Sequence, residues 1–146
     1  MAARSFVISS FGKTFHTTGW KVGYCVAPAF MTTEFRKIHQ YLTFSTATPL
    51  QYAIADYLQN PSPYLELPKF YEEKRNKFID LIQNTRFKYI KTEGTYFQLL
   101  DYSAITDEKD TDFAIRLTKE FGVAAIPISV FYSPNNAENE AKILRF

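Results

Sequence analysis

One short segment near the start of the chain does most to limit how it can fold. Residues 10–24 read SFGKTFHTTGWKVGY and follow the apolar run Phe6–Ile8 after one intervening residue. A continuous apolar run of this kind is typical of a strand that is covered on both faces. Lys21 to Ala27 reads as a second strand, which Pro28 ends. The pattern therefore predicts a strand, a loop that carries Lys13, and a second strand.

Helices and strands alternate over the rest of the chain, which indicates an α/β or α+β class. Thr48 can cap a helix in which Pro49 takes the first position, and Gly122 suits a left-handed cap at the end of a later helix. We expect helices over 35–42, 48–58, 69–84 and 112–121, strands over 95–100, 123–126 and 143–146, and a turn at 134–136.

Composition excludes several classes of function. The net charge of +2 is small and its cations are scattered, which argues against nucleic acid or a membrane surface as a partner. The single cysteine, Cys25, excludes a disulfide framework, and its apolar neighbours predict a buried thiol. His16 and His39 share no helix face, so we expect no metal site. The acidic stretch Asp107–Asp112 reads as the solvated start of a helix. With no leader or membrane-spanning run in view, we expect a cytoplasmic protein.

The segment at 10–24 resembles the cofactor-lysine segment of pyridoxal-phosphate-dependent aminotransferases of the aspartate-aminotransferase-like superfamily. Its GKTF followed by TGWKVG is most similar to the kynurenine, glutamine and methionine aminotransferase branch. The resemblance extends over essentially all of the chain but corresponds to only a fragment of a complete enzyme. It implies an α/β fold in which residues 1–49 are the C-terminal part of the large cofactor-binding domain. Residues 50–146 would then be most of the small C-terminal α+β domain, truncated at its end.

The resemblance assigns the cofactor-binding side chains. Lys13 would condense with the aldehyde of pyridoxal 5'-phosphate and then carry a proton at the substrate α-carbon; the alternative is a solvated surface lysine. Ser10 and Lys21 would bind the phosphate through a hydroxyl and a charge. Most of the superfamily has arginine at the position of Lys21, whereas the branch named above commonly has lysine. The alternative for Ser10 is a local turn cap.

Two more residues match substrate-binding positions. Phe44 matches an aromatic residue that, in this branch, reaches over the neighbouring subunit's active site and contacts an apolar substrate side chain; the alternative is a core aromatic. Arg145 matches the arginine that binds the substrate α-carboxylate, and a planar guanidinium can do so through two parallel hydrogen bonds. The alternative for Arg145 is a salt bridge near the chain end.

The function that the resemblance implies is transfer of an amino group to a 2-oxo acid. The donor would be a methionine-like, glutamine-like or aromatic amino acid, and the full-length enzyme would be a homodimer. We expect these 146 residues to be inactive by themselves, because the groups that orient the cofactor ring normally precede the lysine segment. A carbon–sulfur β-lyase shares the fold and the lysine and is the enzymatic alternative. A non-catalytic interaction fragment is the alternative from another class.

Overall fold

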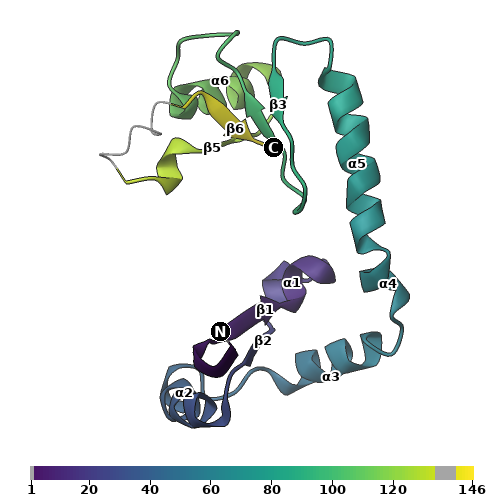
Figure 1. The fold of residues 1–146 in the computed structure, drawn as a ribbon, viewed down its shortest axis with the longest axis vertical. Helices are drawn as coiled ribbons and strands as arrows, with labels where there is room; N and C mark the ends of the chain where they lie inside the picture. Colours follow the sequence, from purple (N-terminus) through teal and green to yellow (C-terminus); the bar gives the residue numbers. More distant parts are fainter. Residues whose placement is uncertain (1, 134–140) are drawn as a thin grey trace. The chain divides into compact units, whose positions relative to one another are not determined.

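The computed structural model describes residues 2–133 and 141–146. Two compact units make up the chain, Met1–Pro68 and Lys69–Phe146 (Figure 1). In the N-terminal unit the order, with η for 3-10 helices, is η1 (Ala2–Arg4), β1 (Val7–Ser10), α1 (Phe11–Thr14), η2 (Thr18–Trp20), β2 (Gly23–Val26), α2 (Ala29–Leu42), α3 (Thr48–Tyr57) and α4 (Ser62–Leu65).

Strands β1 and β2 form an antiparallel pair, from Val7 opposite Val26 to Ser10 opposite Gly23. The two predicted strands are therefore confirmed, but the first strand is not buried on both of its faces as predicted. Ile8 is 78% exposed, because the described part of this unit supplies no layer over that side of the two-stranded sheet. The same reason makes the prediction of a buried thiol wrong, since Cys25 lies exposed in β2.

Two helices of the N-terminal unit were predicted: α3 lies where the sequence predicts it, and α2 begins at Ala29, six residues before its predicted start at 35. The short helices α1 and α4 were not predicted. Helix α3 includes Thr48 as its first residue, so the capping position belongs to Ala47 and the predicted Thr48 cap is wrong by one residue. The start of α3 is held instead by Gln51, whose Nε2 donates to the backbone oxygen of Thr46 at 2.8 Å. Of the residues of α3, only Ile54 is buried.

The C-terminal unit contains a four-stranded antiparallel sheet in the order β3-β4-β6-β5. The last strand is thus inserted between two earlier ones. The elements are α5 (Leu67–Ile82, whose first turn crosses the unit boundary), β3 (Lys88–Ile90), β4 (Leu99–Asp101), α6 (Asp110–Phe121), β5 (Ile126–Pro127), η3 (Ser129–Phe131) and β6 (Ile143–Arg145).

The core of this unit lies between β6 and α6. Leu144 of β6 is fully buried and packs with Tyr102, Phe113 and Ala114; Figure 1 shows α6 lying along the sheet. Side chains alternate between the faces of a strand, so Arg145, the next residue of β6, lies on the face opposite α6. Gly122 ends α6 with a φ of 68°, which confirms its predicted left-handed cap.

Differences from the predicted elements concentrate in the strands of this unit. The strand expected over 95–100 is shifted to Leu99–Asp101, and the one expected over 123–126 is confined to Ile126–Pro127. Strand β3 was not predicted, and the turn expected at 134–136 lies outside the described residues. Strand β6 occupies the region predicted for it.

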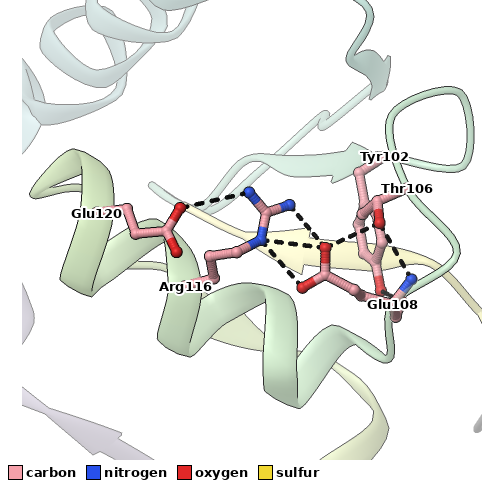
Figure 2. Close-up of polar contacts among 5 residues, drawn as sticks. All are labelled: Tyr102, Thr106, Glu108, Arg116 and Glu120. Atoms are coloured by element: carbon pink, nitrogen blue, oxygen red, sulfur yellow. Dashed lines mark hydrogen bonds and ion pairs between the residues drawn. The ribbon is translucent and has the colours of Figure 1, made fainter.

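A polar network fastens α6 to the segment that precedes it (Figure 2). The Arg116 guanidinium donates from Nε and Nη2 to the Glu108 carboxylate, with a shortest distance of 2.7 Å. Thr106 donates its hydroxyl to the same carboxylate, and the Tyr102 hydroxyl donates to the Glu108 backbone oxygen at 2.9 Å. Hydrogen bonds from Arg116 and Thr106 lower the pKa of Glu108. Among the described helices, none has both the length and the apolar character needed to cross a bilayer.

Candidate functional site

The last residue of β1 and the loop that joins β1 to β2 carry three of the predicted site residues. The loop is closed at its base, because Ser10 pairs with Gly23 in the strand ladder and the Phe11 backbone N–H donates to the Val22 oxygen at 3.1 Å. Gly23 is required there, since a Cβ at this position would lie 2.5 Å from the Ser9 carbonyl oxygen. This close approach fixes where the loop leaves β1 and returns to β2.

Ser10 ends β1 and begins α1. Its Oγ accepts a hydrogen bond from the Gly12 backbone N–H at 3.1 Å, so the turn-cap alternative describes its local contact. A serine hydroxyl that accepts one hydrogen bond still has its own O–H to donate. Gly12 is buried, and a Cβ there would approach Thr18 Cα at 3.1 Å. The residue at position 12, directly before Lys13, therefore has to be small.

Lys13 and Lys21 lie at opposite ends of the closed loop. Lys13 belongs to the single turn of α1 and is exposed. Lys21 follows η2 in the left-handed region, with a φ of 56°, and is also exposed. Ser10, Lys13 and Lys21 thus lie on one segment, which leaves β1 and returns to β2. The sequence prediction missed Thr17 of the same loop, whose hydroxyl is buried without a hydrogen-bond partner among the described residues.

The donor set of this loop suits a phosphate and an aldehyde. Two amines and hydroxyl groups can neutralise and hydrogen-bond phosphate oxygens, and an amine can condense with an aldehyde. The first acidic residue in the sequence is Glu34, so no carboxylate from residues 1–33 competes for these donors. In chemical terms the loop therefore fits the cofactor that the sequence predicts.

Phe44 lies just beyond the end of α2, in the left-handed region with a φ of 65°. The residue is 84% exposed, so the alternative of a core aromatic does not hold within the described part of this unit. The Phe44 backbone N–H donates to the His39 oxygen at 3.2 Å, and the ring of His39 packs against Phe35. These contacts fix the backbone of the turn and leave the Phe44 side chain available for contact with another molecule.

Arg145 lies in the centre of the four-stranded sheet, opposite Leu99 on one side and Ile126 on the other. Its guanidinium carbon lies 4.1 Å from the ring centre of Phe97 and 5.1 Å from that of Phe131. The Nε atom is buried without a hydrogen-bond partner in the described residues. No ion pair of Arg145 occurs among those residues either, so the salt-bridge alternative finds no support in them.

Such a guanidinium can receive an anion. Buried N–H groups are nearly always hydrogen-bonded in folded proteins, and the aromatic rings beside Arg145 stabilise its charge without using its N–H groups. A carboxylate can accept from two of these groups at once. Lys13 and Arg145 belong to different compact units. No group of three or more side chains suited to a metal occurs in the parts of the chain that are described.

The sequence model of the family described as "Aminotransferase class I and II" matches residues 2–142. The chain is 55% identical over 129 residues to the methionine aminotransferase of Escherichia coli (strain K12), which covers 88% of this chain and 33% of that protein. It is 34% identical over 165 residues to the kynurenine–oxoglutarate transaminase of Dictyostelium discoideum, which covers 100% of this chain and 38% of that protein.

Solved structures show the same similarity. An Escherichia coli protein whose crystal structure identified a methionine aminotransferase function superposes with a TM-score of 0.92 at 50% identity, over 99% of this chain and 38% of that one. The N-succinyldiaminopimelate aminotransferase of Mycobacterium tuberculosis superposes with a TM-score of 0.88 at 31% identity, over 100% of this chain and 38% of that one. The chain thus spans between 33% and 38% of the length of these relatives.

Proposed function

We propose that this chain, which belongs to the aminotransferase class I and II family, supplies the cofactor lysine and the substrate arginine of an amino-acid aminotransferase. The family depends on pyridoxal phosphate, and the expected fold class is confirmed, because aminotransferase structures superpose on nearly the whole chain. The observation that carries the proposal is the closed loop with Ser10, Lys13 and Lys21, whose donors suit this cofactor.

Lys13 is the proposed catalytic residue. When bound, pyridoxal phosphate supplies an aldehyde that takes the amino group and a ring that withdraws electrons from the substrate α-carbon. The Lys13 amine would hold the cofactor covalently until the substrate amine displaces it, and would then move a proton at the α-carbon. Its position on the short turn after β1, behind the buried Gly12, supports a defined placement of this amine.

Ser10 and Lys21 would bind the cofactor phosphate. The Ser10 hydroxyl can donate while its oxygen still accepts from Gly12, and Lys21 contributes a positive charge from the other end of the loop. The Thr17 hydroxyl, which has no hydrogen-bond partner among the described residues, is a third group that could donate to a phosphate oxygen. Lysine supplies charge without the two-bond fork of arginine, so the serine contact should matter for orientation.

Arg145 and Phe44 are the proposed substrate-binding residues. Arg145 would hold the α-carboxylate through paired hydrogen bonds, and its buried Nε atom, which has no hydrogen-bond partner among the described residues, supports this role. Phe44 would contact the apolar part of the substrate in the neighbouring subunit of a homodimer. Its exposed ring supports that role. Exposed apolar residues of α2 support a subunit contact: Phe30, Ile38, Tyr41 and Leu42.

The proposed donors are methionine-like, glutamine-like or aromatic amino acids, and the acceptor is a 2-oxo acid. Similarity to a methionine aminotransferase and to kynurenine transaminases supports this range. In the full-length protein, residues 1–49 would belong to the cofactor-binding domain and 50–146 to the small domain. The exposed thiol of Cys25 is compatible with the reducing cytoplasm, where we place the protein.

The test is product analysis with full-length protein, methionine and a cysteine conjugate. Conversion of methionine to its 2-oxo acid, with the amino group appearing on an added 2-oxo acid, supports an aminotransferase. Release of a thiol, pyruvate and ammonia from the conjugate, with no amino transfer from methionine, would identify a β-lyase instead. If neither reaction occurs, the result favours a non-catalytic fragment.

The role of Lys13 has its own spectral test. The Lys13→Ala variant should lose turnover, and it should also lose the absorbance band of the lysine-bound cofactor at about 400 nm. Lys37→Ala is the matched control, because Lys37 is an exposed lysine of the same unit that pairs with Glu34. A Lys13→Ala protein that keeps both the band and the activity would remove Lys13 from its proposed role.

A further inference from the structure

We propose that Asp110 is a positioning residue for Arg145. It binds Ser129 and thereby fixes the short helix η3, whose Phe131 lies against the Arg145 guanidinium. This inference rests on the proposed function, because it assumes that Arg145 binds the substrate carboxylate. It adds a residue that touches neither substrate nor cofactor and that the sequence predicted to be solvated.

Asp110 is only 4% exposed although it carries a carboxylate. Its Oδ1 accepts from the Ser129 hydroxyl at 2.7 Å and from the Thr111 backbone N–H at 2.9 Å. Its Oδ2 accepts from the Ser129 backbone N–H at 2.7 Å. Two of these three bonds go to one residue far along the chain, so the carboxylate joins the start of α6 to η3.

A buried carboxylate is unfavourable unless hydrogen bonds satisfy its oxygens. A residue whose task was to cap α6 could do so from the surface, with one bond to a backbone N–H. Asp110 makes that local bond to Thr111, but its remaining acceptor capacity is directed to Ser129. The burial of the Asp110 carboxylate is therefore explained by its bonds to Ser129 of η3 and not by the need to cap α6.

Within the described residues, η3 itself has few other contacts that could hold it, apart from its link to β5, which pairs with β6. Val130 and Phe131 are 59% and 60% exposed, so apolar burial contributes little at these two positions. Two backbone bonds, from Phe131 to Ile128 and from Tyr132 to Ser129, shape the turn internally but do not attach it to the rest of the unit. The bonds from Ser129 to Asp110 do attach it.

Phe131 connects η3 to Arg145, because its ring lies against the Arg145 guanidinium. The centre of the Phe131 ring lies 5.1 Å from the guanidinium carbon, and that of the Phe97 ring lies 4.1 Å from it. Phe97 is held at the sheet by the next residue, Gln98, whose backbone forms two hydrogen bonds with that of Phe146. A long arginine side chain loses rotamer freedom when it binds an anion, and holding it in place beforehand reduces that loss. Loosening η3 should therefore weaken carboxylate binding and leave the cofactor loop unaffected.

The experiment uses the full-length protein with its cofactor and the probe methylthiobutanoate, the carboxylate that corresponds to methionine without its amino group. Isothermal titration calorimetry measures its dissociation constant, and a separate titration measures that of the cofactor. Asp110→Asn is isosteric but cannot accept from all three donors, because one carboxylate oxygen is replaced by an amide NH2 group, which only donates. We expect it to weaken probe binding about tenfold, and Ser129→Ala to do so about threefold, with cofactor affinity unchanged.

Glu108→Gln is the matched control. It disturbs the carboxylate network shown in Figure 2, which binds the same helix from the segment before it, and within the described residues Glu108 makes no bond to η3. Its probe affinity should equal that of the unaltered protein. Should Asp110→Asn fail to fold, Ser129→Ala decides, because it removes a single hydroxyl. Probe affinity that is unchanged in Ser129→Ala and in a folded Asp110→Asn would overturn the inference.

Arg145→Gln separates the inference from the proposed function. If the unaltered protein binds the probe and Arg145→Gln does not, the role of Arg145 stands, and the Asp110 and Ser129 variants test the positioning alone. If the probe binds Arg145→Gln as tightly as the unaltered protein, or does not bind the unaltered protein, the proposed role of Arg145 fails and the inference fails with it.

Discussion

Replacement of Tyr102 by phenylalanine should destabilise the C-terminal unit at neutral pH and stabilise it at high pH. The Tyr102 ring is fully buried and packs against Phe113 with ring centres 4.6 Å apart. Its hydroxyl donates to the Glu108 backbone oxygen at 2.9 Å. Burial, followed by the negative charges of Asp110 and Glu108, raises the pKa of Tyr102 from its ordinary value of 10.0 to about 12.

The two effects have opposite signs. At neutral pH the variant loses one hydrogen bond and leaves a carbonyl oxygen without its donor, which costs about 1 kcal/mol. The raised pKa means that the folded state favours neutral Tyr102. This contribution is complete below pH 10 and is lost as the pH rises through about 12, by about 2–3 kcal/mol in all. Phenylalanine has no such loss, so near pH 12 the variant should be the more stable protein by about 1–2 kcal/mol.

Urea denaturation followed by circular dichroism, from about pH 7 to about pH 12, measures the free energy of unfolding of both proteins. Other tyrosines titrate in both, so the difference between the two curves isolates Tyr102. Tyr89→Phe is the matched control, because Tyr89 is 50% exposed, and its effect at neutral pH should stay within about 0.5 kcal/mol. Parallel stability curves for Tyr102→Phe and the unaltered protein would refute the reasoning.

Three further substitutions test the loop, the core and the polar network. Lys21→Ala should weaken cofactor retention by about 1–3 kcal/mol in a titration of the full-length apoprotein; an effect no larger than that of Lys37→Ala would show that Lys21 contributes only general charge. Leu144→Ala should lower the free energy of unfolding by about 2–5 kcal/mol, since the side chain is fully buried, and a smaller loss would contradict its place in the core. The pKa of Glu108 is lowered by its hydrogen bond from Arg116, so its stabilisation is present above pH 4.5 and is lost as the pH falls. Glu108→Gln should therefore be less stable than the unaltered protein at neutral pH only, and a difference that persists in acid would argue against the ion pair as its cause.

Local features of the fold could be predicted from the sequence because they depend on residues close together in the chain. The strand before Lys13, the strand after it and the cap at Gly122 follow from apolar runs and from backbone preferences of single residues. Helix α6 is found within two residues of its predicted start and ends at its predicted last residue. The candidate cofactor loop belongs to this class, since its base is a local strand pair.

Features that depend on distant residues could not be predicted in this way. Asp110 looks solvated in a stretch rich in acidic residues, and its burial follows from Ser129, which no local pattern connects to it. The rings beside Arg145 come from two other segments of the chain. The predictions that Ile8 and Cys25 are buried were wrong for a related reason. An apolar run indicates that its residues tend to be buried, but it does not indicate which other segments of the chain would cover them.

The two groups expected to act on a substrate are positioned by separate sets of contacts. In the N-terminal unit, the approach of Gly23 to the Ser9 carbonyl oxygen closes the loop that carries Lys13. In the C-terminal unit, the bonds between Asp110 and Ser129 hold the turn that lies against Arg145. Residues without shared partners usually contribute additively to the free energy. Substitutions in the first set should therefore change cofactor binding and those in the second set carboxylate binding, and a double variant from both sets should show the sum of the two effects.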